Sequence, residues 1–142
     1  MKIREFEKSR FLDYCNRADE FFKAMNDEII LERYNASALL GIHASIAIAD
    51  SITIYESGKR SADEQHLEAV KFLKSICNTK GISEDGSNRL GKILSEKNFV
   101  AYGEHFRPMD DTKLQSIRLN VERFFSWAYK NFDYLRRIST EG

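Results

Sequence analysis

The segment at residues 36–49, ASALLGIHASIAIA, constrains the fold of this chain most strongly. Its apolar residues cover nearly the whole circumference of a helix, which is typical of a helix enclosed by its neighbours. Small residues alternate with large ones along it, so other helices can approach its backbone closely. At 14 residues, with His43 inside it, the stretch is too short and too polar to predict a membrane span. It predicts the central helix of a packed domain.

Composition favours helices in the rest of the chain. One proline and seven glycines in 142 residues leave little punctuation for a many-stranded β fold. The 42% of apolar residues are too many for a disordered chain. Lys and Arg balance Asp and Glu at 22 each, which gives no reason to expect strong non-specific binding to nucleic acid or to a membrane. We expect one domain over residues 1–142.

The apolar period of 3.6 residues predicts about five helices. They cover residues 3–25, residues 31–55, a third stretch from a capping box at 61–64 to Gly81, residues 85–103, and a last helix capped by Asp110 or Asp111. The last helix has the clearest stripe: Leu114, Ile117, Val121, Phe124, Phe125, Ala128, Phe132 and Leu135. Short connections predict an all-α, up-and-down antiparallel bundle.

The cysteines and the N-terminus indicate a cytoplasmic protein. Cys15 and Cys77 fit neither a zinc-ligand spacing nor a redox pair, and each lies on an apolar stripe, so we expect two buried thiols and no disulfide. The first residues alternate in charge and do not form a signal peptide.

The histidines do not predict a metal site. His43, His66 and His105 form no HExxH motif, and His66 supplies only a single DxxH. We therefore expect no metal and no cofactor. A metal-dependent helical enzyme, built from three histidines that converge from three helices, remains the weakest alternative.

Two groups of polar residues are candidates for a functional site. His43 and Asp50 lie two helical turns apart on one face, where they either line a groove or satisfy separate buried hydrogen bonds. We expect Asp50 to be buried and bonded to another helix, with His66 or Tyr102 as its partner. Lys97, Tyr102 and His105 form the second group, and together they could bind a phosphate and move protons. The alternative is a solvated lysine, a packed tyrosine and a histidine that caps the helix.

The aromatic run at residues 124–129 is better explained as core or as a dimer interface than as a platform for stacking bases, and the apolar surplus of this helix supports a dimer. Trp127 points to a different face of that helix from its neighbours. It is the aromatic residue we expect in an oligomer contact.

Four strings resemble the HEPN superfamily: HASIAIADSI at 43–52, HLEAV at 66–70, ILSEKNFVAY at 93–102 and RFFSWA at 123–128. The resemblance spans about residues 30–132. It implies a compact bundle of about five helices that forms a homodimer or binds a partner. Many members are metal-independent ribonucleases of toxin–antitoxin or defence systems, or modules paired with a nucleotidyltransferase.

The family's catalytic signature, an arginine followed after four to six residues by a histidine, is incomplete here. Lys97 and Tyr102 stand in those places, His105 lies too far along, and Asn98 takes the polar position after the basic residue. Tyrosine is a poor base at neutral pH, and lysine replaces a bidentate guanidinium by a point charge.

The resemblance therefore implies a non-catalytic or divergent HEPN-like module that acts by dimerisation or by binding a partner. That partner would be a nucleotidyltransferase or an antitoxin-type protein, and no membrane is involved. The alternative is a metal-independent ribonuclease or nucleotide-binding module that uses Lys97, Asn98, Tyr102 and His105.

Overall fold

The computed structural model describes residues 3–61, 67–97, 100 and 109–135. The described part is helical almost throughout, which confirms the all-α fold. Its long helices are α1 (Phe11–Ile30), α2 (Tyr34–Ser57), α3 (Leu67–Lys80), α4 (Asp85–Ser95) and α6 (Asp111–Asn131). A 3-10 turn, η1 (Lys8–Arg10), and two short strands, β1 (Ile3–Glu5) and β2 (Lys59–Ser61), complete the described elements.

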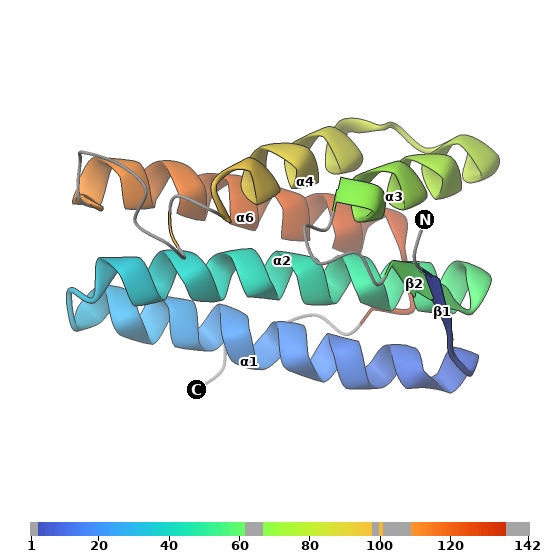
Figure 1. Ribbon diagram of the computed structural model, residues 1–142, viewed down its shortest axis with the longest axis horizontal. Helices are drawn as coiled ribbons and strands as arrows, with labels where there is room; N and C mark the ends of the chain where they lie inside the picture. Colours follow the sequence, from blue (N-terminus) through green and yellow to red (C-terminus); the bar gives the residue numbers. More distant parts are fainter. Residues whose placement is uncertain (1–2, 62–66, 98–99, 101–108, 136–142) are drawn as a thin grey trace.

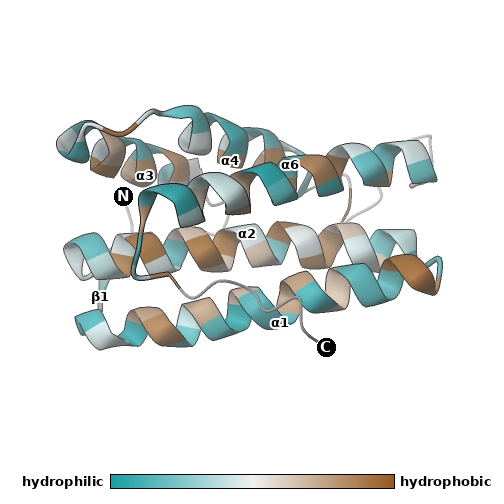
Figure 2. Ribbon diagram, turned by 180° about the vertical axis from the view of Figure 1, so that it is seen from behind, coloured by the Kyte–Doolittle hydropathy of each residue, from teal (hydrophilic) through white to brown (hydrophobic). Residues whose placement is uncertain are grey.

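Helix α2 is the centre of the bundle, as residues 36–49 predict. It packs along α1 on one side and against α3, α4 and α6 on the other (Figure 1). Its middle carries few polar residues, and Figure 2 shows it in brown and white between the more mixed helices. A Cβ on Gly41 would lie 2.7 Å from the sulfur of Met25 on α1 and 3.3 Å from Val121 on α6. The small residue therefore sets the close approach of three helices.

Length and composition alone would allow α2 to cross a membrane, because it has 24 residues and is strongly apolar. Most of its apolar surface is buried against the other helices of the same chain. The core of the fold therefore accounts for this hydropathy.

Residues 3–10 do not form the start of the helix that the sequence predicts from residue 3. They contain β1 and η1, and β1 pairs antiparallel with β2 in the register Arg4 to Arg60. Gly58 makes this pairing possible, because its φ of 69° ends α2 in the left-handed region and turns the chain back. Ser61, expected to cap the third helix, is instead a buried residue of β2. The rest of that capping box lies outside the described residues.

The fourth helix is shorter than the expected residues 85–103. Helix α4 ends at Ser95, Glu96 forms a turn, and Lys97 is helical again.

The N-terminus of α6 agrees with the sequence, since Asp110 accepts a hydrogen bond from the backbone N–H of Lys113 at 2.8 Å. The apolar stripe of α6 is buried, and so are Phe132 and Leu135, which continue the stripe after the helix ends. Cys15 and Cys77 are free and buried, as expected.

Trp127 packs inside its own chain, against α4. A Cβ on Gly86 would lie 2.1 Å from the indole ring, so the two helices meet at this glycine. Phe124 stacks on the indole with ring centroids 5.8 Å apart, and Phe132 contacts it edge-on at 5.6 Å. This packing explains the position of Trp127 without the oligomer contact that the sequence led us to expect.

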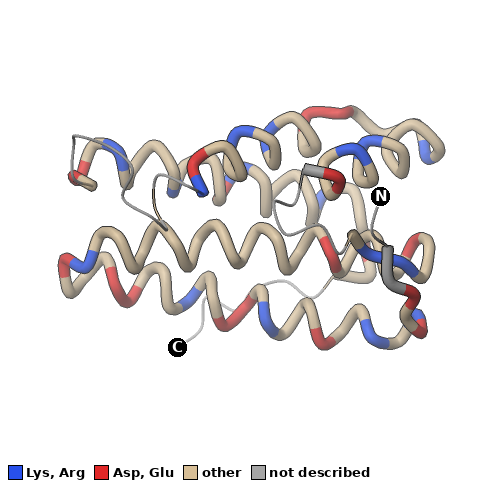
Figure 3. The backbone as a smooth tube through the Cα atoms, in the orientation of Figure 1, with Lys and Arg blue, Asp and Glu red and all other residues tan. Residues whose placement is uncertain are grey.

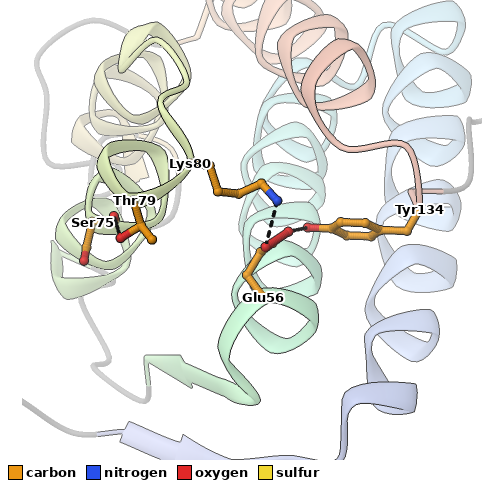
Figure 4. A network of polar contacts seen from close by, with 5 residues as sticks. All are labelled: Glu56, Ser75, Thr79, Lys80 and Tyr134. Carbon is orange, nitrogen blue, oxygen red and sulfur yellow. Dashed lines mark hydrogen bonds and ion pairs between the residues drawn. The ribbon is translucent and has the colours of Figure 1, made fainter.

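Residues after α6 return to α2 at one end of the bundle (Figure 4). The hydroxyl of Tyr134 donates to Oε2 of Glu56 at 2.8 Å, and Nζ of Lys80 donates to Oε1 of the same carboxylate at 3.2 Å. Burial and the Glu56 carboxylate raise the pKa of the Tyr134 hydroxyl above its ordinary value, so it stays protonated as a donor. The ring of Tyr134 stacks on Tyr55, with centroids 3.4 Å apart.

Candidate anion-binding pocket

A pocket of about 270 Å³ opens where α1, α2 and β2 meet. Phe21 on α1 and Ile46 and Ala47 on α2 form its apolar lining. Four residues with ionisable side chains complete the lining: Arg17, His43, Asp50 and Arg60. His43 and Asp50 therefore share one pocket, as their spacing on a helix allows.

Asp50 lies at the inner side of this pocket and is 4% exposed. Its Oδ2 accepts a hydrogen bond from Nη1 of Arg60 at 3.0 Å. Burial raises the pKa of the Asp50 carboxyl to about 6, although the positive charges of Arg60 and Arg17 oppose the rise. Asp50 is thus buried and bonded as expected, but the bond runs to strand β2 and not to another helix. His66 and Tyr102, the partners expected from sequence, lie outside the described residues.

The two arginines are held against aromatic rings. The guanidinium carbons of Arg17 and Arg60 lie 4.9 Å and 5.5 Å from the ring centroid of Tyr14. Arg60 also lies 5.7 Å from the ring of Phe6. These cation–π contacts fix both guanidinium groups beside the pocket with fewer protein hydrogen bonds than they can make. Nε of Arg60 is buried with no hydrogen-bond partner among the described residues.

His43 is the partly exposed member of the polar lining that α2 contributes beside Asp50. Its ring lies 5.9 Å from the ring of Phe21, centroid to centroid. Burial, and after it the positive charge of Lys97, lower the pKa of the imidazole below its ordinary 6.5. The imidazole is therefore mainly neutral at neutral pH, with one nitrogen to donate and one to accept. Lys97, which follows α4, acts electrostatically on this pocket although it does not line it.

Of the residues selected from sequence, the structure thus places His43 and Asp50 in one pocket, and Lys97 near enough to His43 to lower its pKa. Four others, namely Asn98, His66, Tyr102 and His105, lie outside the described residues. Among the side chains that are described, no three of His, Cys, Asp and Glu are grouped so as to hold a metal ion.

Sequence reasoning missed Arg17, Phe21 and Arg60. Arg17 lies on the exposed side of an amphipathic helix, where a basic residue normally contacts only water. Arg60 follows the turn at Gly58, and only the pairing of β2 with β1 directs it toward Asp50.

Charge along α2 is confined to its second half, where Asp50 and Glu56 lie (Figure 3). A lone carboxylate on an enclosed helix implies a cationic partner, and this is the one signal that could have led to Arg60.

The chain matches no protein-family model, and no curated protein is similar to it at a significant level.

Proposed function

We propose that this protein is a HEPN-like binding module, cytoplasmic and non-catalytic, whose pocket takes the phosphate group of a nucleotide or of an RNA end. The observation that carries the proposal is the convergence of Arg17 from α1 and Arg60 from β2 on one pocket. Guanidinium groups match the geometry of phosphate oxygens and are favoured where phosphate is recognised.

The charge of the lining supports an anionic ligand. Two arginines outweigh the one carboxylate in the lining, and the mainly neutral His43 adds little charge. Lys97 adds a further positive charge close to His43. An anion therefore gains from at least two fixed cations, while a cationic ligand would meet them as repulsion.

The size of the pocket limits the ligand. About 270 Å³ is just below the range of about 300–1,000 Å³ that is typical of small-molecule sites. The pocket can enclose a phosphate with part of its sugar, while the base would lie toward the opening. Phe21 and His43 are the aromatic rings of the lining, and aromatic rings stack on bases with little regard to sequence.

Calorimetric titration with adenosine monophosphate and with a short 5′-phosphorylated RNA tests this function. We expect saturable binding that Arg17→Gln weakens about tenfold, the loss of one charge-assisted hydrogen bond. Arg118→Gln, on α6 outside the pocket, is the matched control and should bind like wild type. Absence of binding at millimolar ligand, or equal weakening by both variants, would exclude the proposal.

A ribonuclease is the second candidate, because a mainly neutral imidazole lies close to the positive charge of Lys97. His43 would take the proton of a ribose 2′-hydroxyl as its oxygen bonds to phosphorus, the bond to the 5′-oxygen would break and that oxygen would take a proton from water, while Lys97 and the arginines balance charge on the phosphate. This version predicts cleavage of single-stranded RNA in EDTA that His43→Gln and Lys97→Ala abolish. Tyr102→Phe tests the role that the family resemblance gives to Tyr102. Intact RNA after prolonged incubation would rule out the enzyme and leave the binding module.

The homodimer implied by the resemblance is also a proposal. The apolar stripe of α6 no longer supports it, because that stripe is used in the core. Three large apolar side chains are exposed among the described residues: Ile30 (80%) and Leu31 (56%), at the turn between α1 and α2, and Leu119 (45%) on α6. Light scattering after size exclusion tests the dimer, and a strict monomer at tens of micromolar would exclude it. The pocket lies within one chain, so its binding does not depend on this result.

A further inference from the structure

Arg60 has two competing uses in the pocket. Its Nη1 donates to Asp50 at 3.0 Å, yet both residues line the space that an anion would enter. An anion that reaches the Arg60 guanidinium must therefore lie next to the Asp50 carboxyl. Two negative groups around one guanidinium, with one of them buried, are strongly unfavourable unless one is neutralised.

We propose that Asp50 is a proton-dependent competitor of the ligand, so that the pocket takes up one proton on Asp50 with each anion that it binds. The inference rests on the proposed function, since it needs an anion in this pocket. In the free protein the ionised Asp50 pairs with Arg60. In the complex the carboxyl carries a proton and the anion is the partner of Arg60. The proton on Asp50 offsets one of the negative charges that the anion brings into the pocket.

The groups around Asp50 support this exchange. Arg60 faces it from β2 and Arg17 from α1, and both favour the ionised carboxylate in the free protein. On α2 itself His43 lies two turns away, with its own pKa lowered by burial and by Lys97. No second carboxylate lines the described pocket. An incoming anion therefore acts on one carboxyl in this lining, that of Asp50, and it disfavours the ionised form of that group.

The direction of the pH dependence follows from the position of this group. The pKa of Asp50 in the free protein is raised to about 6. A nearby anion raises it further, because it disfavours the charged carboxylate. Between the two pKa values binding carries a proton with it, and affinity falls by up to about tenfold for each unit of rising pH. Below about pH 6 the carboxyl is already protonated, and this dependence disappears.

His43 is the competing explanation, because a protonated imidazole would also attract an anion. Its pKa in the free protein is lowered from 6.5 by burial and by the positive charge of Lys97. Two single variants separate the groups. Asp50→Asn keeps the size of the side chain and an oxygen that can accept from Arg60, and it removes both the negative charge and its titration. His43→Gln removes the imidazole and leaves Asp50 intact.

The test uses inorganic sulfate, which does not titrate near neutral pH, with affinity measured by calorimetry between about pH 6 and about pH 8. We expect wild-type affinity to fall about tenfold or more over this range, with proton uptake detected in buffers of different ionisation enthalpy. Asp50→Asn should lose the dependence and bind more tightly than wild type at the upper end. His43→Gln should keep the slope.

Wild-type affinity independent of pH, or a slope that survives in Asp50→Asn and vanishes in His43→Gln, would overturn the coupling and leave the proposed function intact. Absence of binding of both sulfate and adenosine monophosphate at every pH would overturn both. If Asp50→Asn does not fold, the carboxyl carbon of Asp50 is followed by NMR in the wild-type protein. Its pKa must rise on adding sulfate, and an unchanged pKa contradicts the inference.

Discussion

Arg60 donates from Nη1 to Oδ2 of the buried Asp50 at 3.0 Å, and this bond ties strand β2 to the side of α2. The two side chains differ in their access to water, since that of Arg60 is 20% exposed and that of Asp50 is 5% exposed. The bond has two consequences: it holds the short β1–β2 pair against the bundle, and it places a guanidinium at the pocket.

Removing the carboxyl of Asp50 should destabilise the protein. Asp50→Ala leaves a cavity and deprives the partly buried Arg60 of its partner, at an expected cost of about 1–3 kcal/mol in the free energy of unfolding. Asp50→Asn should stay within about 1 kcal/mol of wild type, because it keeps the volume and an acceptor oxygen. Urea denaturation at neutral pH measures both, and an Asp50→Ala variant as stable as wild type would contradict the role of the bond.

The same carboxyl should make stability depend on pH. Its pKa in the folded protein, about 6, lies above the ordinary 3.8, so the native state holds the proton longer than the unfolded chain. This contribution is therefore most favourable at low pH and is lost as the pH rises from about 4 to about 6, by up to about 3 kcal/mol. His43 has the opposite effect on the free energy of unfolding: because its pKa is lowered in the folded protein, its contribution to stability is lost as the pH falls below 6.5.

Urea denaturation of wild type and Asp50→Asn across this range isolates the Asp50 contribution, because His43 is common to both proteins. The stability of wild type relative to the variant should fall as the pH rises through the window. A flat difference, or one of opposite sign, would show that burial does not raise the pKa of Asp50.

Gly86 and Gly91 should respond oppositely to alanine, although both lie in α4. At Gly86 the new methyl group would overlap the ring of Trp127, so we expect a loss of about 2–3 kcal/mol. At Gly91 the nearest atom is a methyl carbon of Val70 at 3.9 Å, an ordinary contact. The higher helix propensity of alanine should then stabilise the protein by about 0.5–1 kcal/mol. Thermal unfolding of the two variants checks this, and equal melting temperatures would disprove the packing of Trp127 on α4.

Tyr134 should contribute through its hydroxyl as well as its ring. Tyr134→Phe keeps the stacking on Tyr55 and removes the bond to Glu56, at an expected cost of about 1 kcal/mol. Lys80→Gln removes the ion pair between Lys80 and Glu56, which is more exposed to water. This should lower the free energy of unfolding by less than about 0.5 kcal/mol. If chemical denaturation gives the larger loss for Lys80→Gln, the hydroxyl bond is not what holds this segment.

The helices could be predicted from sequence wherever buried apolar residues recur every 3.6 residues along the chain. The stripe from Leu114 to Leu135 is buried at every expected position, and the enclosed segment at 36–49 is the centre of the bundle. The N-terminal strand was missed because three residues pair only after Gly58 has reversed a distant part of the chain. The break at Glu96 was missed because no proline or glycine marks it.

The pocket could be predicted only in part. Helical spacing alone places His43 and Asp50 on the same face, and so this pair was found. Arg17 and Arg60 are brought to the pair by the packing of α1 and by the β1–β2 pairing, which depend on contacts far apart in sequence. In sequence they are indistinguishable from the other 20 basic residues.

The most direct test of the account follows the imidazole of His43 by NMR while adenosine monophosphate is added. The signal is assigned by its loss in His43→Gln. The account predicts a saturable shift of this signal, because the bound anion changes the electrostatic environment of the imidazole. The shift should be much smaller in Arg60→Gln. A ligand that binds without moving the His43 signal, or that binds equally well to Arg60→Gln, would show that this pocket is not an anion site.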